Sequence, residues 1–266
     1  MRVPLRIVVT RAEHQSEGLA AAFARAGAAV ELLPLLEVVP AADPRPLERA
    51  AAELFIYDWV VFTSANAVDA FLPLAGPLPP PLRIAAVGPA TAEALRARGI
   101  EPHLTAGRAD AEGLAAELAP QVAGKRVLLP QAADARPALL AGLTSAGAEA
   151  VAVVAYDKRL PPEAPGRAAE LFATSPLGWV TFTSPRIVRH FAELFGVDWE
   201  RRRGELRAAS IGPVTSAELR RLGVEPAAEA RQPSDEEMVA AVARAEGRTG
   251  TNTDEQGPTG TAEIFR

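Results

Sequence analysis

The stretch that decides the fold is an apolar run ending in two hydroxyl residues, Trp59-Val60-Val61-Phe62-Thr63-Ser64-Ala65-Asn66-Ala67-Val68. It predicts a buried strand over 59–63 that leads directly into a helix over 66–74. A near copy, Trp179-Val180-Thr181-Phe182-Thr183-Ser184-Pro185-Arg186-Ile187-Val188, follows 120 residues later. The first N–H groups of a helix have no partner within it, and the helix dipole makes that end attractive to anions. Two such strand ends predict a ligand held between two halves of the chain.

The near copy belongs to an internal duplication. Matching residues are first separated by 120 positions, namely Arg6 and Arg126, Leu19 and Leu139, Gly27 and Gly147, Trp59 and Trp179, and Thr63-Ser64 and Thr183-Ser184. The separation then grows to 124, since Val87-Gly88-Pro89-Ala90-Thr91 matches Ile211-Gly212-Pro213-Val214-Thr215. We expect the four additional residues in a loop at 198–205, where an insertion costs little. At 266 residues, the chain is long enough for two domains of similar construction.

Short apolar runs alternate with amphipathic segments along both copies. The expected strands cover 6–10, 30–34, 59–63, 83–87, 125–130, 151–159, 207–211 and a run beginning at Trp179, and 35–40 is also extended. The expected helices cover 16–26, 46–54, 66–74, 91–98, 137–146, 165–174 and 215–222, and the capping box at 234–237 opens a last helix through Ala245. This order predicts an α/β fold with two parallel-sheet domains, each covered by helices on both faces. Ligands of such sheets bind at the carboxyl ends of the strands, where the Thr-Ser and Gly-Pro-x-Thr motifs lie.

Composition excludes several classes of function. The chain has no cysteine, which rules out disulfides, thiolate zinc sites and cysteine nucleophiles, and its three histidines are too scattered for a helical metal pair. A net charge of −5 argues against a general nucleic-acid binder. The N-terminal apolar run is too short for a signal peptide, and no apolar run is long enough to span a membrane. We therefore expect a cytoplasmic protein with no metal, nucleic-acid or membrane partner.

Each motif at the strand ends has a structural and a functional interpretation. Thr63-Ser64 and Thr183-Ser184 either only cap the following helices, at about 1 kcal/mol each, or also contact a ligand. Residues 88–91 and 212–215 either form turns, with proline near the first helical position and threonine as the cap, or bind a ligand. Neither Gly-Pro motif matches the glycine patterns of dinucleotide or P-loop sites. The location of all four motifs at ligand-side ends favours function.

Other positions have less definite assignments. Arg11 follows the first strand and is either a clamp for a carboxylate or an exposed arginine beside a helix start. From the residues alone, Tyr156 is expected to pack at a strand end, and Arg201-Arg202-Arg203 is expected in a solvated loop. The Gly/Thr-rich segment 247–266 is expected to be a disordered tail. No Ser-His-Asp or paired-carboxylate signature can be assigned.

Taken together, these motifs resemble the uroporphyrinogen-III synthase family, cofactor-free enzymes that close and rearrange a linear tetrapyrrole. The resemblance covers residues 4 to about 245, and the order and spacing of its motifs are more specific than any one of them. The motifs are Val8-Val9-Thr10-Arg11, residues 59–68, Val87-Gly88-Pro89-Ala90-Thr91-Ala92-Glu93-Ala94-Leu95, Val154-Ala155-Tyr156, Phe182-Thr183-Ser184-Pro185 and Ile211-Gly212-Pro213-Val214-Thr215-Ser216-Ala217-Glu218-Leu219.

The resemblance implies two α/β domains, the second inserted into the first. The outer domain would comprise 1–36 and 158–246, and the inner one 41–153, with 35–40 and 153–159 as the connecting strands. The repeat by itself would place a boundary near residue 120, so these limits come from the family and not from the periodicity.

The resemblance also implies a ligand and its contacts. The family's substrate, hydroxymethylbilane, is a polycarboxylate expected in the cleft between the domains. Backbone N–H groups at helix starts bind anions without a net positive protein, and Arg11 would add a charge-assisted donor. The expected substrate-binding residues are Arg11, Thr63, Ser64, Ala65, Asn66, Gly88, Thr91, Thr183, Ser184, Gly212 and Thr215. At Thr63 and Ser64 we expect the backbone, rather than the side chain, to make the contact.

The implied reaction starts with loss of the terminal hydroxyl as water and passes through a spiro intermediate that inverts ring D. The uninverted isomer forms spontaneously, so the enzyme's main task is to orient the chain. A phenol can help the hydroxyl leave by donating a hydrogen bond. Tyr156 matches the tyrosine that the family is suspected of using, at the connection between the domains.

Two other function classes stay open from the residues alone. One is a non-enzymatic, cytoplasmic two-domain α/β protein that binds a small anion such as a sugar phosphate through the same helix ends. The other is a regulator whose α/β halves mediate protein contacts, against which the acidic balance counts. The family resemblance favours a monomer that acts without a cofactor.

Overall fold

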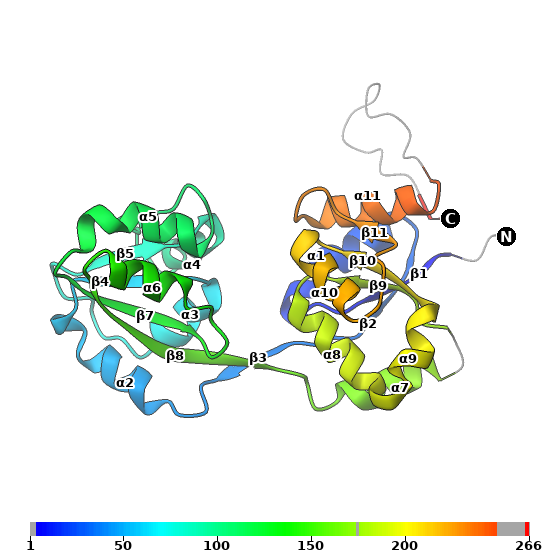
Figure 1. Ribbon diagram of the computed structural model, residues 1–266, viewed down its shortest axis with the longest axis horizontal. Coiled ribbons are helices and arrows are strands. Elements are labelled where there is room, and N and C mark those ends of the chain that lie inside the picture. The colour runs from blue at the N-terminus through cyan, green and yellow to red at the C-terminus, as the bar shows by residue number, and fades with distance from the viewer. Residues whose placement is uncertain (1–3, 174–175, 249–263, 266) are drawn as a thin grey trace, which may run out of the picture. The chain divides into compact units, whose positions relative to one another are not determined.

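The computed structural model describes residues 4–173, 176–248 and 264–265, without the side chains of 13–15. The chain divides into two compact units (Figure 1). The first unit comprises Met1–Glu37 and Arg159–Arg266, and the second comprises Val38–Lys158. The second unit is thus a continuous segment that interrupts the first. No described helix is long and apolar enough to cross a membrane.

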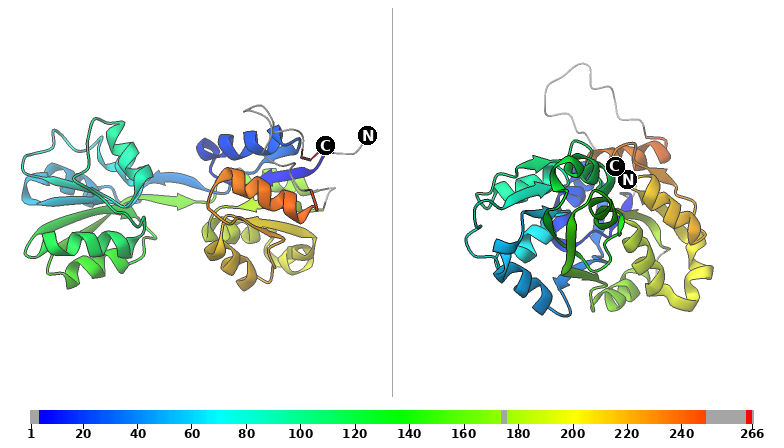
Figure 2. Two further views of the ribbon diagram at one scale, coloured as in Figure 1. Left: turned by 90° about the horizontal axis from the view of Figure 1, so that it is seen from above. Right: turned by 60° about the vertical axis from the view of Figure 1, so that its left-hand side comes forward.

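The first unit is a five-stranded sheet in the order β11-β10-β9-β1-β2. Its strands are β1 (Arg6–Val9), β2 (Ala29–Leu32), β9 (Gly178–Phe182), β10 (Leu206–Ser210) and β11 (Ala228–Glu229), and all neighbouring pairs are parallel. The helices are α1 (Glu13–Arg25), α7 (Ala164–Phe172), α8 (Pro185–Phe195), α10 (Pro213–Arg221) and α11 (Asp235–Ala245). Apolar residues of α1 and α11 form a core on one face, and those of α7, α8 and α10 form a core on the other. Figure 2 shows the sheet between these helix layers.

The second unit repeats this plan with six strands in the order β3-β8-β7-β4-β5-β6. The strands are β3 (Glu37–Pro40), β4 (Trp59–Phe62), β5 (Arg83–Ala86), β6 (Leu104–Thr105), β7 (Arg126–Ala132) and β8 (Glu149–Arg159). The helices are α2 (Arg45–Ala52), α3 (Ala65–Phe71), α4 (Pro89–Arg96), α5 (Ala111–Val122) and α6 (Ala138–Ser145), and the 3₁₀ turn η1 spans Leu54–Ile56. One core lies under α2, α3 and α4 and the other under α5 and α6. The predicted α/β class with parallel strands is confirmed.

The strand at the centre of each unit shows why the repeat folds twice in the same way. Trp59 and Val61 in β4 enter the core on one face while Val60 and Phe62 enter the other, so every residue of the strand is buried. Trp59 lies under the guanidinium of Arg83 at 4.5 Å from the ring centroid, and Trp179 lies under Arg207 at 4.4 Å. Each arginine lies at the start of the neighbouring strand, as the first residue of β5 or the second of β10, and pairs in register with its tryptophan. A cation over an indole face contributes about 0.5–2 kcal/mol.

The expected loop at 198–205 is wrong. The segment consists of the 3₁₀ turn η2 (Gly196–Asp198), α9 (Trp199–Arg202) and the 3₁₀ turn η3 (Arg203–Glu205). Trp199 is buried against Phe191 and Phe195, so the inserted residues acquire an apolar contact of their own. The prediction of a solvated loop also fails at Arg202, whose side chain is only 19% exposed. Its guanidinium donates to the carbonyl of Phe172 at 3.2 Å and lies over the ring of Phe195.

One helix was missing from the prediction, and the start of another differs from it. Helix α5 has no counterpart in the prediction, although Asp110 is an N-cap whose carboxylate accepts the Gly113 N–H at 2.7 Å. The capping box of α11 is only half formed: the Ser234 hydroxyl accepts the Glu237 N–H at 3.1 Å. The Glu237 carboxylate instead accepts the N–H of Arg231 and pairs with Arg244, because both donors lie within reach.

The predicted disordered tail lies partly outside the described residues, which exclude 249–263 and 266. Where it is described, disorder is the wrong prediction. Phe265 is fully buried, its ring centroid lies 6.2 Å from that of Phe23, and its N–H donates to the carbonyl of Ala26 at 2.7 Å. Burying one phenylalanine side chain contributes about 1.5–3 kcal/mol to the stability of the fold. The Gly/Thr-rich composition of the segment does not reveal this contribution.

Candidate functional site

The end of β4 forms the first corner, which we call the Ser64 corner (Thr63–Asn66 with Tyr156). Ser64, in extended conformation, is the N-cap of α3, and its Oγ accepts the N–H of Ala67 at 3.2 Å. Thr63 is therefore not the cap. Residues 63–66 are all half-buried, so the backbone and side chains at this strand end remain within reach of a ligand.

The Ser64 hydroxyl also contacts the phenol of Tyr156. The two oxygens lie 3.0 Å apart, and Tyr156 is only 4% exposed. Tyr156 belongs to β8, and β7 separates β8 from β4 in the sheet. The side chain thus reaches across the end of β7 to the start of α3. Tyr156 therefore does more than pack at a strand end.

A β-bulge aims Tyr156 at Ser64. The pairing of β7 with β8 shifts between Gln131 and Ala132, so that Gln131 faces Val154 but Ala132 faces Tyr156. Strict alternation would turn Tyr156 to the opposite face from Ala155, because successive side chains of a strand point to opposite faces. The extra residue instead leaves Ala155 and Tyr156 in the same core, beneath α2, α3 and α4.

The end of β9 forms the equivalent Ser184 corner (Thr183–Pro185). Ser184 has nearly the same backbone conformation as Ser64, and its Oγ accepts the Ile187 N–H at 3.4 Å as the N-cap of α8. Two differences separate the corners. Pro185 has no N–H at the first helical position, where Ala65 has one. In addition, the first unit, to which Ser184 belongs, contains no tyrosine, since both tyrosines of the chain belong to the second unit.

The Gly-Pro turns form two further strand ends. Gly88 and Gly212 are the N-caps of α4 and α10, with proline at the first helical position. The interpretation in which threonine caps these helices is wrong, because Thr91 and Thr215 lie inside the first turn and are 4% and 2% exposed. Only glycine fits at 88, since a Cβ there would come within 2.6 Å of the Cβ of Ala109.

Arg11 is already occupied by a carboxylate of its own chain. Its guanidinium lies 3.0 Å from Oδ1 of Asp235, the first residue of α11, and the two side chains are 30% and 23% exposed. The interpretation as an exposed arginine beside a helix start is therefore wrong, because Arg11 is half-buried. A substrate carboxylate at Arg11 would have to share the guanidinium with Asp235.

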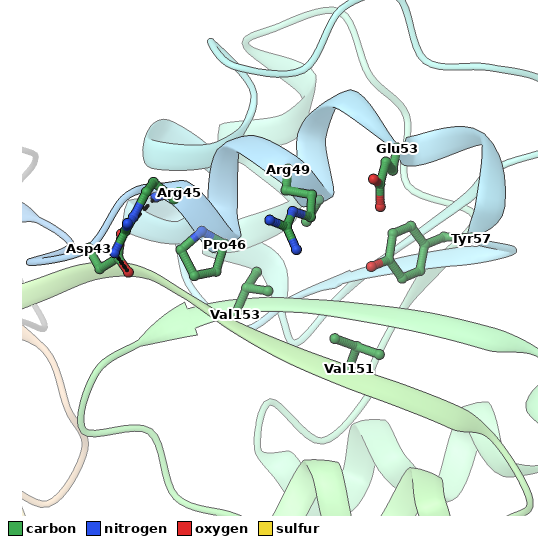
Figure 3. Close-up of a pocket in the computed structure, with 9 residues that line it drawn as sticks. Asp43, Arg45, Pro46, Arg49, Glu53, Tyr57, Val151 and Val153 are labelled. Carbon is green, nitrogen blue, oxygen red and sulfur yellow. Dashed lines mark hydrogen bonds and ion pairs between the residues drawn. The ribbon is translucent and has the colours of Figure 1, made fainter.

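Tyr57, the second tyrosine of the chain, lines a cavity that the sequence did not predict. A cavity of about 360 Å³ lies between α2 and β8, where Figure 3 shows Arg49, Glu53 and Tyr57 around an apolar floor of Val151 and Val153. The remaining lining residues are Asp43, Arg45, Pro46 and Ala50. Burial raises the pKa of Tyr57, while the paired Arg45 lowers the pKa of Asp43. None of the predicted site residues lines this cavity, so we do not assign the substrate to it.

No three described His, Cys, Asp or Glu side chains cluster in a way that could hold an ion. Next to the Ser64 corner, the Lys158 ammonium lies 5.6 Å from the ring centroid of Tyr156. This lysine, which sequence reasoning gave no role, adds positive charge beside the phenol.

Comparison with known proteins gives consistent matches. A family model described as uroporphyrinogen-III synthase HemD matches residues 17–240. The uroporphyrinogen-III synthase of Synechococcus elongatus is 38% identical over 220 residues, which cover 79% of this chain and 83% of that protein. A putative uroporphyrinogen-III synthase of Methanothermobacter thermautotrophicus is 31% identical over 233 residues, 82% of this chain and 90% of the relative.

Two solved structures share the fold. A mutant uroporphyrinogen III synthase from Thermus thermophilus superposes with a TM-score of 0.62 at 21% identity and covers 92% of this chain and 100% of its own. The uroporphyrinogen-III synthetase of Helicobacter pylori superposes with a TM-score of 0.63 at 19% identity and covers 90% and 98%. At these identities the likeness concerns the fold.

Proposed function

The chain belongs to the uroporphyrinogen-III synthase family, and on this premise we propose how its residues carry out the family's reaction. Membership makes it a cyclising enzyme of porphyrin biosynthesis, and the family prediction is confirmed. It also decides against the alternative of a non-enzymatic protein that binds a small anion. The substrate in the proposal is hydroxymethylbilane, a linear tetrapyrrole that carries carboxylates along its length.

The observation that carries the proposal is the contact of 3.0 Å between the Tyr156 phenol and the Ser64 hydroxyl at the end of β4. The carboxyl end of a parallel strand is where α/β sheets bind their ligands. A phenol held there can donate its proton toward an oxygen of the substrate. We assign Tyr156 to the terminal hydroxyl of hydroxymethylbilane, the group that must leave.

In the first step, the bond between the terminal carbon and its hydroxyl oxygen breaks, and the electron pair leaves with the oxygen. The lone pair of the adjacent pyrrole nitrogen replaces those electrons, which gives the azafulvene after loss of the N–H proton. The departing oxygen takes up one proton, so that water is released. Tyr156 stabilises the charge that develops on this oxygen by donating a hydrogen bond, and no cofactor takes part in the balance.

The second part of the proposal concerns orientation. Attack by the substituted carbon of ring D forms the spiro intermediate, whereas attack by the free carbon gives the uninverted ring without help. Holding reactants in one geometry can contribute several kcal/mol, so fixing the carboxylates of the bilane is enough to favour one route. The chain has to bind several carboxylates, and both units supply strand ends suited to anions.

The proposed carboxylate donors are backbone N–H groups at the helix starts. The Ser64 corner contributes most, since Ala65 and Asn66 both have an N–H in the first turn of α3. The corners with Pro89, Pro185 and Pro213 each lack the first of these donors. The full proposed set is Arg11, Thr63, Ser64, Ala65, Asn66, Gly88, Thr91, Thr183, Ser184, Gly212 and Thr215.

An isomer assay tests the proposal. The protein is incubated with hydroxymethylbilane, the product is oxidised, and the porphyrin isomers are separated. Type III product in excess over the protein-free control is expected. Type I product alone would overturn the assignment of the reaction to this chain.

A monomeric state and a cytoplasmic location stay predictions. The elution volume of the purified protein in size-exclusion chromatography tests the monomeric state.

A further inference from the structure

Ser64 takes part in two hydrogen bonds at once, and their direction has a chemical consequence. Its Oγ accepts the Ala67 N–H at 3.2 Å and lies 3.0 Å from the phenol oxygen of Tyr156. A serine hydroxyl has one proton and two lone pairs, and a tyrosine hydroxyl likewise has one proton. Only one proton can lie between the two oxygens. The direction of this bond therefore decides what the phenol can offer to anything else.

The two possible directions give the phenol opposite roles. If Tyr156 donates to Ser64, its proton is used, and the phenol can only accept from a further partner. If Ser64 donates to Tyr156, the phenol accepts with a lone pair and keeps its own proton for another oxygen. Only the second arrangement lets Tyr156 assist a departing hydroxyl.

The cap bond favours the second arrangement. Because the Ser64 Oγ already accepts from Ala67, its own O–H becomes a stronger donor, since hydrogen bonds in a chain polarise one another. A chain that runs from the Ala67 N–H through Ser64 to Tyr156 has every bond pointing the same way. The protein fixes both hydroxyl groups of this hydrogen-bond chain: Ser64 by the helix start, and Tyr156 by the bulge in β8 and its burial.

We propose that Ser64 is a positioning residue that directs the Tyr156 proton toward the leaving hydroxyl of the substrate. The inference rests on the proposed function. It gives Ser64 a role in the reaction that is separate from its role as a helix cap. Ser64 donates its own proton to the phenol oxygen as a hydrogen bond throughout, and the Tyr156 O–H donates to the substrate oxygen as the carbon–oxygen bond breaks. No further reactant is needed.

A double-mutant cycle tests the proposal by steady-state kinetics with separation of the isomers. Ser64→Ala removes the donor to the phenol, and Tyr156→Phe removes the phenol. Loss of one hydrogen bond to a reacting group corresponds to about a tenfold fall in kcat. We expect Ser64→Ala to lower kcat about tenfold in the wild-type background but less than about twofold in the Tyr156→Phe background, because residues in one network are not additive.

Ser184→Ala is the matched control for the cycle. It removes the same kind of helix cap, at a corner without a tyrosine, so its effect on kcat is expected to be the same factor with or without Tyr156. Ser64→Thr is the rescue variant, since threonine can cap a helix and retains the hydroxyl. It is expected to restore kcat to within about threefold of wild type.

The outcomes separate the inference from the function on which it rests. Wild-type protein that yields only type I product overturns both. Wild-type protein that yields type III product, with equal losses for Ser64→Ala in both backgrounds, overturns the inference and leaves the function intact. If Tyr156→Phe is too slow for the cycle, a Ser64→Thr variant as slow as Ser64→Ala, with its helix content and stability retained, overturns the inference instead.

Discussion

The Ser64 and Ser184 corners have nearly the same sequence but differ in the hydrogen-bonding groups around the serine. Both follow a buried four- or five-residue strand with a tryptophan near its start, and both use serine as the helix cap in the same extended conformation. Only the Ser64 corner has a phenol 3.0 Å from the cap oxygen and an N–H at the first helical position. A duplicated strand end thus supplies a scaffold twice, while the residues brought to it from elsewhere decide its chemistry.

The largest expected effect tests what the two corners share. Trp59→Ala and Trp179→Ala each remove a buried indole and its contact with the arginine stacked over it, and each should lower the free energy of unfolding by about 3–5 kcal/mol. Urea denaturation followed by circular dichroism measures both. Arg83→Ala and Arg207→Ala are the controls, with losses below about 2 kcal/mol. A loss confined to one of the two tryptophans would mean that the units are not built alike.

The next effect tests what the corners do not share. Tyr156→Phe keeps the packing of the ring but removes the donor, so kcat should fall about 100-fold while the unfolding free energy changes by about 1 kcal/mol. Kinetics with hydroxymethylbilane and thermal denaturation measure the two quantities. Tyr57→Phe is the matched control, since this tyrosine lines the cavity beside α2, and its kcat is expected to equal that of wild type. An unchanged rate for Tyr156→Phe would remove the phenol from the mechanism.

A smaller effect concerns the caps themselves. Ser64→Ala and Ser184→Ala each remove one hydrogen bond to a helix N–H and should each cost about 1 kcal/mol of stability. Equal stability losses combined with unequal losses of kcat would show that capping is common to both corners and does not account for the difference in activity. Ser234→Ala, the cap of α11, gives the reference value for a cap alone. A much larger stability loss at Ser64 would indicate that its contact with Tyr156 is structural.

The smallest effect compares the helices that follow the Gly-Pro turns. Arg221 and Arg189 lower the pKa of the Glu218 carboxyl in α10, whereas Glu93 in α4 is exposed and 3.8 Å from Arg96. A lowered carboxyl pKa adds stability above the ordinary value of 4.5, and this contribution is lost as the pH falls below 4.5 toward the folded-state pKa.

Stability against pH measures this difference. Glu218→Gln should destabilise the protein by up to about 1 kcal/mol at pH 7 and by less at pH 3, where this carboxyl is already largely protonated in the unfolded chain. Glu93→Gln should leave the unfolding free energy nearly unchanged at both values. A Glu218→Gln loss that stays the same at pH 3 would show that the carboxyl acts through packing and not through charge.

Much of the fold could be predicted because its signals are local. The alternation of apolar strands with amphipathic helices depends on residues within one segment, and the repeated Trp59 and Trp179 stretches identify the duplication directly. Segments whose structure depends on distant partners were predicted less well. Residues 199–202 are helical because Trp199 finds apolar rings in α8, and Phe265 is ordered because it meets Phe23 in α1.

In the candidate site, too, local contacts could be predicted and contacts between distant residues could not. Ser64 and Ser184 could be predicted as caps, because a hydroxyl residue before a helix accepts an N–H only three residues away. That Arg11 is held by Asp235 could not be predicted, since 224 residues separate the two along the chain. In the Gly-Pro turns the sequence left threonine as a possible cap, because it does not show that Gly88 and Gly212 take the N-cap position.

The sequence alone was enough to predict the parallel α/β architecture, the duplication, the family and the strand ends that we propose as anion sites. Hydrophobic period, helix capping and motif order are all properties of consecutive residues. Only the tertiary structure decided that Tyr156 meets Ser64, which lies 92 residues away in the chain. That contact requires β7 to lie between β8 and β4, and it requires one extra residue in β8 that reverses the alternation. A register shift is a property of two paired strands and is therefore absent from either strand alone.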